Sequence, residues 1–176
     1  MDRFDEAVLR SVYAAGSGPV WLFALVVVSL LGSGWMLFAL VPVFVMPRLR
    51  AWRARAAWLL AAAVSASAIV SITKALTGRV RPWQALDLAR TTGIALPVDA
   101  SFPSGHAAGS FAVAAFVLTV HRPAGIALFA MATLIAFSRV ALGVHYPTDV
   151  IAGAVLGTLL GLAFGVLAKR RPSRRP

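Results

Sequence analysis

The stretch from Ser138 to Asp149 carries charged side chains at the point where one long apolar segment ends and the next begins. A charged side chain at the centre of a bilayer costs roughly 2.5 to 3.5 kcal/mol on insertion scales, so this placement suggests a chemical role. His145 and Asp149 are four residues apart, so on one helix the carboxylate can accept a hydrogen bond from the imidazole. The pair could form an oriented nucleophile, or it could simply cap a helix. Arg139 adds a cation.

A second group of cations lies between Lys74 and Pro82. Lys74 stands about two helical turns before Arg81, but Gly78 and Pro82 predict that the helix ends between them. Both cations could then turn toward one point and bind an anion. Alternatively, they could anchor the helix end at the membrane interface, because lysine and arginine side chains extend toward water there.

The third group, Ser101 to His106, directly precedes an apolar helix. Here Ser104 and Gly105 are expected to leave their backbone N–H groups free at the helix N-terminus, where the helix dipole favours an anion such as phosphate. His106 follows at once. The alternative is a plain helix cap beside a histidine at the membrane interface.

Together these groups offer three cations, two histidines, one carboxylate and a helix N-terminus. Phosphoryl transfer needs such a set, because cations and N–H groups neutralise the phosphoryl oxygens while one group attacks and another protonates the leaving oxygen. The chain has no cysteine and no cluster of glutamates. We therefore expect no metal site and no cofactor.

The composition indicates which elements must position these groups. Of 176 residues, 60% are hydrophobic and only 13% are charged, which predicts an integral membrane protein. The net charge of +11 does not indicate a nucleic-acid partner, because the basic clusters adjoin apolar segments as cytoplasmic loops do. These clusters are Arg48, Arg50, Arg53 and Arg55, and Lys169, Arg170, Arg171, Arg174 and Arg175.

A bilayer core of about 30 Å needs roughly 20 apolar residues per helix. Apolar segments run over 19–46, 56–76, 106–120, 124–142 and 146–168. The first is interrupted at Leu31 to Gly34, so it fits one tilted span or two short ones, and we favour two. The expected fold is an all-α membrane bundle of about six transmembrane helices, with residues 1–176 as a single domain.

The positive-inside rule then sets the orientation of this bundle. Both basic clusters fall on one side of the membrane, which makes 169–176 a basic cytoplasmic tail and, with six spans, places the N-terminus inside as well. All three polar groups fall together on the extracytoplasmic face of the cell membrane.

Three motifs stand in order at these positions, namely Lys-x6-Arg-Pro at Lys74 to Pro82, Pro-Ser-Gly-His at Pro103 to His106, and Ser-Arg-x5-His-x3-Asp at Ser138 to Asp149. With them the chain resembles the type 2 phosphatidic acid phosphatase superfamily. The apolar composition is similar to that of its membrane lipid phosphatases, such as bacterial undecaprenyl pyrophosphate and phosphatidylglycerol phosphate phosphatases, and not to that of its soluble vanadium haloperoxidases.

This resemblance implies a role for each residue. His145 would be the nucleophile that forms a phosphohistidine, and Asp149 would orient it. His106 would protonate the leaving lipid oxygen and then activate water. The phosphoryl oxygens would be bound by Lys74, Arg81, Ser104, Gly105 and Arg139. Nearby cations are expected to help keep His145 neutral, and therefore nucleophilic.

The expected function is metal-independent hydrolysis of a terminal lipid phosphate at the extracytoplasmic face. Undecaprenyl pyrophosphate is the favoured substrate, since an outward site suits recycling of this carrier, and phosphatidylglycerol phosphate and phosphatidic acid are the alternatives. A small lipid transporter or flippase is the alternative of another class. It would carry ionisable residues along several spans, and here the spans have almost none. The expected partners are the lipid substrate and the bilayer.

Overall fold

The computed structural model describes residues 3–15, 18–86, 88 and 96–170, and within these ranges the chain forms helices joined by turns. In chain order the elements are α1 (Arg3–Ala15), α2 (Pro19–Leu31), the 3-10 helix η1 (Gly34–Leu40), α3 (Val41–Val45), the 3-10 helix η2 (Pro47–Trp52), α4 (Arg53–Thr77), α5 (Pro82–Ala85), α6 (Gly105–Val120), α7 (Arg122–Ala141) and α8 (Pro147–Arg170). The end of the predicted basic tail, 171–176, lies outside the described residues.

Three stretches of helix are long and apolar enough to cross a membrane, namely Pro47–Ala85, Arg122–Ala141 and Pro147–Arg170. Pro19–Leu31 and Gly105–Val120 are shorter apolar helices. Large aliphatic side chains point outward along the long helices, for example Ile72, Leu134 and Leu159. A bilayer can cover such a surface, whereas water would not favour it. The predicted all-α membrane fold is confirmed.

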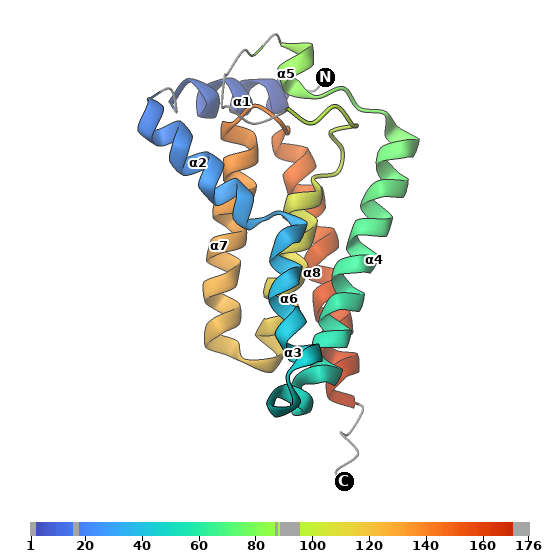
Figure 1. Ribbon diagram of the computed structural model, residues 1–176. Coiled ribbons are helices and arrows are strands. Elements are labelled where there is room, and N and C mark those ends of the chain that lie inside the picture. The colour runs from blue at the N-terminus through green and yellow to red at the C-terminus, as the bar shows by residue number, and fades with distance from the viewer. Residues whose placement is uncertain (1–2, 16–17, 87, 89–95, 171–176) are drawn as a thin grey trace.

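Helices α4, α6, α7 and α8 run alongside one another along the length of the molecule (Figure 1). Among the described elements, α6 and α8 share the most extensive contact, because α8 presents small residues to α6 at intervals of four. A Cβ atom added at Gly157 would overlap the backbone carbonyl of Ala108. Two helices can approach this closely only where one of them lacks side chains. This contact fixes how the N-terminal ends of α6 and α8 sit beside each other.

The end of α4 shows why the first motif contains a glycine and a proline. Gly78 has a φ of 55° and donates its N–H to the carbonyl of Lys74 at 3.1 Å, so a left-handed residue closes the helix. Arg81 is extended, with φ −74° and ψ 151°, as the residue before a proline prefers. The predicted helix end between Gly78 and Pro82 is confirmed. It turns the Arg81 side chain back toward the bundle.

The count of six transmembrane helices is not confirmed. The 19–46 segment does break where expected, after α2, but α2, η1 and α3 follow one another down the molecule as one interrupted passage (Figure 1). Two hydrogen bonds support this interpretation. Asp5 of α1 accepts one from Thr148 at the start of α8, which lies at the end of the motifs, whereas the carbonyl of Val43 accepts one from Arg53 at the start of α4, which lies at the opposite end. The chain therefore changes ends once between residues 5 and 43.

Within the described residues, this interrupted passage together with α4, α6, α7 and α8 gives five traverses of the bundle. The N-terminal helix α1 consequently lies at the same end as the three motifs, and not at the end of the basic clusters as a six-span layout requires. The glycines at 32 and 34 interrupt a helix, as expected from the sequence, but they do not reverse the chain.

Candidate active site

The histidine and aspartate of the third motif meet at the start of α8. Nδ1 of His145 lies 3.4 Å from Oδ2 of Asp149, and both side chains are buried. The same carboxylate oxygen accepts the backbone N–H of Tyr146 at 2.9 Å. Because a carboxylate accepts and does not donate, Nδ1 is the protonated nitrogen and Nε2 keeps its lone pair. This is the predicted arrangement of the pair.

The two cations of the first motif meet at one carboxylate, Asp99, as predicted for a shared point, and Arg81 also approaches His145. Nη1 of Arg81 lies 3.3 Å from Nε2 of His145 and donates to the carbonyl of Val144 at 2.8 Å. Nη2 of Arg81 and Nζ of Lys74 each pair with a different oxygen of Asp99, at 2.6 and 2.5 Å. A carboxylate thus bridges the two cations. This shows that their spacing suits an anion with two oxygens.

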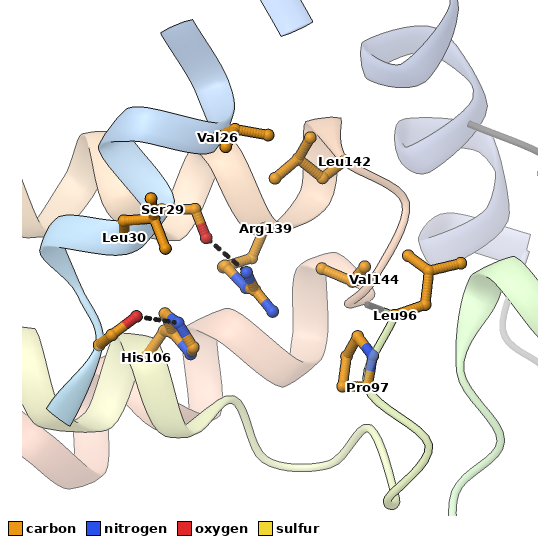
Figure 2. A pocket seen from close by; sticks show the side chains of 10 residues that line it. Val26, Ser29, Leu30, Leu96, Pro97, His106, Arg139, Leu142 and Val144 are labelled. Carbon is orange, nitrogen blue, oxygen red and sulfur yellow. Dashed lines mark hydrogen bonds between the residues drawn. The ribbon is translucent and has the colours of Figure 1, made fainter. Parts of the chain in front are cut away.

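Arg139 reaches the site from the end of α7. Its Nη1 donates to Oγ of Ser29 on α2 at 2.5 Å, while among the buried polar atoms of the described residues its Nε stands without a hydrogen-bond partner. Arg139 lines a cavity of about 220 Å³ together with His106. Figure 2 shows both side chains facing this space, whose other walls include Val26 and Leu30 of α2.

His106 lies between two cavities. The first is the one that it shares with Arg139, and the second, of about 270 Å³, contains Lys74 and Asp99. Nε2 of His106 lies 3.3 Å from Oγ of Ser33, in the break after α2. The imidazole therefore lies at the boundary between the largely apolar first cavity and the cavity that contains Lys74. It can contact a group bound in either one.

The second motif forms the N-terminus of α6. Oγ of Ser104 accepts the N–H of Ala107 at 3.4 Å, so Ser104 is the helix cap that the sequence left as an alternative. Its own backbone N–H donates to the carbonyl of Asp149 at 3.0 Å, and the expectation that this N–H is free is therefore wrong. The bond ties the second and third motifs together. Gly105 is exposed beside the second cavity.

Burial and nearby charges keep His145 neutral. Burial lowers its pKa most, the bond to Asp149 raises it, and the charges of Arg139 and Arg81 lower it, with a resulting pKa of about 4. An imidazole with this pKa carries a free lone pair at physiological pH. The expected influence of the cations is present, but burial is the larger cause.

Asp99 is held in the charged form. Burial raises the pKa of this carboxyl, but the bonds from Lys74 and Arg81 outweigh it and lower the pKa to about 2. Asp99 remains 58% exposed, so water competes with both pairs. Among the described residues, no three His, Cys, Asp or Glu side chains lie close enough together to hold a metal ion.

Several residues at this site were not predicted from the sequence. Arg79 stands inside the first motif without an assigned role, yet its Nη1 donates to Oδ1 of Asp149 at 2.6 Å and its Nη2 to Oδ2 of Asp5 at 2.6 Å. Ser29 of α2 contacts Arg139, and Ser33, in the break after α2, contacts His106. The presence of a second arginine two residues before Arg81 is a sequence feature that could have identified Arg79. Nothing in the spacing of the N-terminal residues points to the site.

A family model described as the PAP2 superfamily matches residues 55–172. The chain belongs to the PAP2 superfamily. This confirms the resemblance drawn from the three motifs, and the protein is a membrane lipid phosphatase of the PAP2 type. The matched residues begin in α4, so α1 and α2 lie outside them.

Individual PAP2 relatives cover different parts of the chain. The decaprenylphosphoryl-5-phosphoribose phosphatase of Mycobacterium tuberculosis is 37% identical over 73% of this chain and 68% of its own length. An undecaprenyl-diphosphatase of Bacillus subtilis is 39% identical over 38% of this chain and 34% of its own. The crystal structure of a PAP2 phosphatidylglycerolphosphate phosphatase from Bacillus subtilis superposes with a TM-score of 0.77 at 25% identity, covering 97% of this chain and 87% of that one.

Proposed function

We propose that this PAP2 phosphatase hydrolyses the terminal phosphate of a polyprenyl lipid at the extracytoplasmic face, through a phosphohistidine formed on His145 and without a metal ion. The observation that carries the proposal is the convergence of His145, its partner Asp149 and the Arg81 guanidinium at one end of the bundle. The free nitrogen of the histidine faces the very cation that would hold the phosphoryl group.

In the first half-reaction Nε2 of His145 attacks phosphorus, and the bond from phosphorus to the leaving oxygen breaks. Asp149 accepts the Nδ1 proton in a hydrogen bond throughout, which stabilises the positive charge that develops on the imidazole. His106 gives a proton to the leaving oxygen. Its position between the cation cavity and the largely apolar cavity supports this role, because the leaving lipid must depart from the phosphate at that point.

In the second half-reaction His106, now neutral, takes a proton from water while the water oxygen attacks phosphorus and releases inorganic phosphate from His145. The cations Lys74, Arg81 and Arg139 neutralise the phosphoryl oxygens in both halves. Support comes from the geometry of Asp99, whose two oxygens already occupy Lys74 and Arg81 as two phosphoryl oxygens would. Gly105 could add its backbone N–H from the N-terminus of α6.

Two relatives are named for polyprenyl substrates, one for decaprenylphosphoryl-5-phosphoribose and one for undecaprenyl diphosphate. We therefore place the substrate in this class, with undecaprenyl pyrophosphate as the compound favoured by an outward-facing site. Phosphatidylglycerol phosphate and phosphatidic acid are the alternatives, and the first has support from the superposed Bacillus structure. A flippase or lipid transporter gains no support from relatives named as phosphatases.

The orientation rests on charge. Arg48, Arg50, Arg53 and Arg55 lie at or near the start of α4, at the end of the bundle opposite the motifs, where α8 also ends with Lys169 and Arg170. The positive-inside rule assigns that end to the cytoplasm and the site to the other face.

Phosphate release in detergent micelles tests this proposal. With EDTA present, we expect the purified protein to release inorganic phosphate from undecaprenyl pyrophosphate and orthovanadate to inhibit it. His145→Ala should abolish turnover, and His106→Ala should slow it by roughly 10² to 10⁴, the usual contribution of general acid catalysis. Wild-type rates in either variant, or strict metal dependence, would exclude the mechanism.

Substrate choice is measured separately, so that the chemistry can hold even if the lipid is different. We expect kcat/KM to be higher for undecaprenyl pyrophosphate and decaprenylphosphoryl-5-phosphoribose than for phosphatidylglycerol phosphate and phosphatidic acid. A preference for the two glycerolipids would reject the polyprenyl assignment. His121→Gln is the matched control, since His121 is exposed at the opposite end of the bundle.

A further inference from the structure

A buried network joins the N-terminal helix to the candidate nucleophile. Arg79 bridges two carboxylates, with Nη1 at 2.6 Å from Oδ1 of Asp149 and Nη2 at 2.6 Å from Oδ2 of Asp5. Both carboxylates are fully buried, and the arginine side chain is 25% exposed. Uncompensated charges are costly in such a place, and this one guanidinium is ion-paired with both buried carboxylates.

Asp5 also caps the helix that carries Asp149. Its Oδ1 accepts the backbone N–H of Thr148 at 3.0 Å, and its Oδ2 accepts the Thr148 hydroxyl at 2.6 Å. Thr148 is the second residue of α8, where a backbone N–H has no acceptor within its own helix. A carboxylate from α1 thus serves as the cap of α8, a role usually filled by a neighbouring residue of the chain.

Arg79 holds the turn before α8 as well. Its guanidinium lies over the ring of Tyr146, 4.3 Å from the ring centroid. Tyr146 directly follows His145 and donates its N–H to Asp149. Arg79 therefore contacts the residue next to the nucleophile and the carboxylate that orients it. With Oδ1 of Asp149 taken by Arg79, Oδ2 is the oxygen that remains for the imidazole.

We propose that Arg79 and Asp5 are positioning residues that hold Asp149, and through it His145, in the geometry for attack, so that helix α1 is a working part of the active site. This inference rests on the proposed role of His145 as nucleophile. It concerns a helix outside the residues that match the PAP2 family, and it assigns a function to the arginine that the first motif leaves open.

A double-mutant cycle tests the inference with undecaprenyl pyrophosphate in detergent micelles. We expect Arg79→Gln to lower kcat by about 10²-fold, the loss typical of a misplaced catalytic group, with little change in KM. Combined with Asp149→Asn, it should add little further loss, because both changes disrupt the same interaction. Arg79→Lys should recover only part of the rate, since an ammonium lacks the planar fork that serves two carboxylates.

Asp5→Asn keeps an oxygen for the Thr148 N–H but removes the charge that holds Arg79. We expect about a 10-fold loss in kcat, and this variant decides the question should Arg79→Gln fail to fold. The control is Glu6→Gln on the same helix, which removes an exposed carboxylate paired only with Arg10 among the described residues and should retain the wild-type kcat.

Wild-type kcat in both Arg79→Gln and Asp5→Asn would overturn the inference. So would full additivity in the cycle, since Arg79 would then act independently of Asp149. If these variants are fully active while His145→Ala and Asp149→Asn are inactive, the proposed function stands and this inference fails. An active His145→Ala variant would reject the proposed function itself.

Discussion

Asp99 places a carboxylate between Lys74 and Arg81, the two cations that we assign to the phosphate. A phosphoryl group that binds these cations must compete with it. Because Asp99 is more than half exposed, water screens the pairs, and such pairs contribute about 0 to 1 kcal/mol. The carboxylate is therefore a weak competitor that phosphate can replace, and its removal should have a small effect of defined sign.

We expect Asp99→Asn to lower KM and the inhibition constant of orthovanadate by up to about fivefold, which corresponds to the upper limit for an exposed pair. Steady-state kinetics in micelles measure both constants. Glu6→Gln removes an equal charge at the same end of the molecule and serves as the control. Higher constants in Asp99→Asn would mean that the carboxylate holds the cations in place for the substrate.

The pH profile of kcat/KM follows from the environment of His145. Burial, opposed by Asp149 and assisted by Arg139 and Arg81, lowers its pKa to about 4, so the imidazole is neutral at any pH above that value. A nucleophile must be unprotonated. We therefore expect the fall of kcat/KM on the acid side of the profile to be centred well below the ordinary histidine pKa of about 6.5. Circular dichroism at each pH separates this fall from unfolding. A loss of rate centred near the ordinary value would contradict the assignment.

At the residue scale, the motifs pointed to side chains that the structure brings together at the candidate site, and they missed the residues that contact these side chains from other elements. The proximity of His145 to Asp149 was predictable, because their spacing of four residues brings the two side chains together at the start of α8. The contact of Asp5 with α8 was not predictable, because 143 residues separate Asp5 from Thr148 and no local pattern connects them. Pairing across such a distance is set by how the helices pack.

Packing between α6 and α8 determines how the two histidines sit relative to each other. His106 is the second residue of α6, His145 lies two residues before α8, and the glycine face of α8 sets the separation of the two helices. The hydrogen bond from the Ser104 N–H to the Asp149 carbonyl then fixes the positions of α6 and α8 relative to each other along the bundle axis. Small residues deep in the bundle thus control distances at its end.

The same Gly→Ala change at two sites tests this dependence. We expect Gly157→Ala to destabilise the protein by about 1 to 3 kcal/mol, because its Cβ would overlap the Ala108 carbonyl. Gly109→Ala on α6 meets open space and should be neutral or stabilising by up to about 1 kcal/mol, as expected from helix propensity. Thermal unfolding in detergent measures the stability of both variants. Equal melting temperatures would show that α6 and α8 can move apart at Gly157 without loss of stability.

At the scale of elements, the sequence predicted the ends of helices more accurately than the direction in which successive helices cross the bundle. Gly78 and Pro82 end α4 through local backbone geometry, which needs no tertiary information. The break after α2 was equally visible at Gly32 to Gly34. Whether the chain reverses there depends on contacts made by α1 and α3, and these are invisible to hydropathy.

Across the whole molecule, charge is divided between the two ends of the bundle. The four described acidic residues, Asp5, Glu6, Asp99 and Asp149, lie at the end of the candidate site, where they pair with cations. The opposite end carries the arginines of 48–55 without an acidic residue among the described ranges. This asymmetry suits a protein with one fixed orientation in the membrane.

Cysteine labelling tests the five-passage arrangement directly, since the natural chain has no cysteine. We expect a reagent that cannot cross membranes to label Val98→Cys and Ser11→Cys from outside intact cells, but not Ala51→Cys. With six spans, Ser11→Cys would instead be protected together with Ala51→Cys. Labelling of all three after the membrane is permeabilised shows that each site is reactive.

The interruption of the first passage at Gly32 to Gly34 bears on how water reaches the site. Backbone without regular helical bonding occurs at membrane depth only where protein buries it or where it borders a hydrated cavity. Gly32 and Gly34 border the cavity that also contains Ser67, Lys74 and His106. We expect this cavity to be hydrated and to supply the molecule that His106 activates, so that the broken helix gives hydrolysis its reactant from within the thickness of the bilayer.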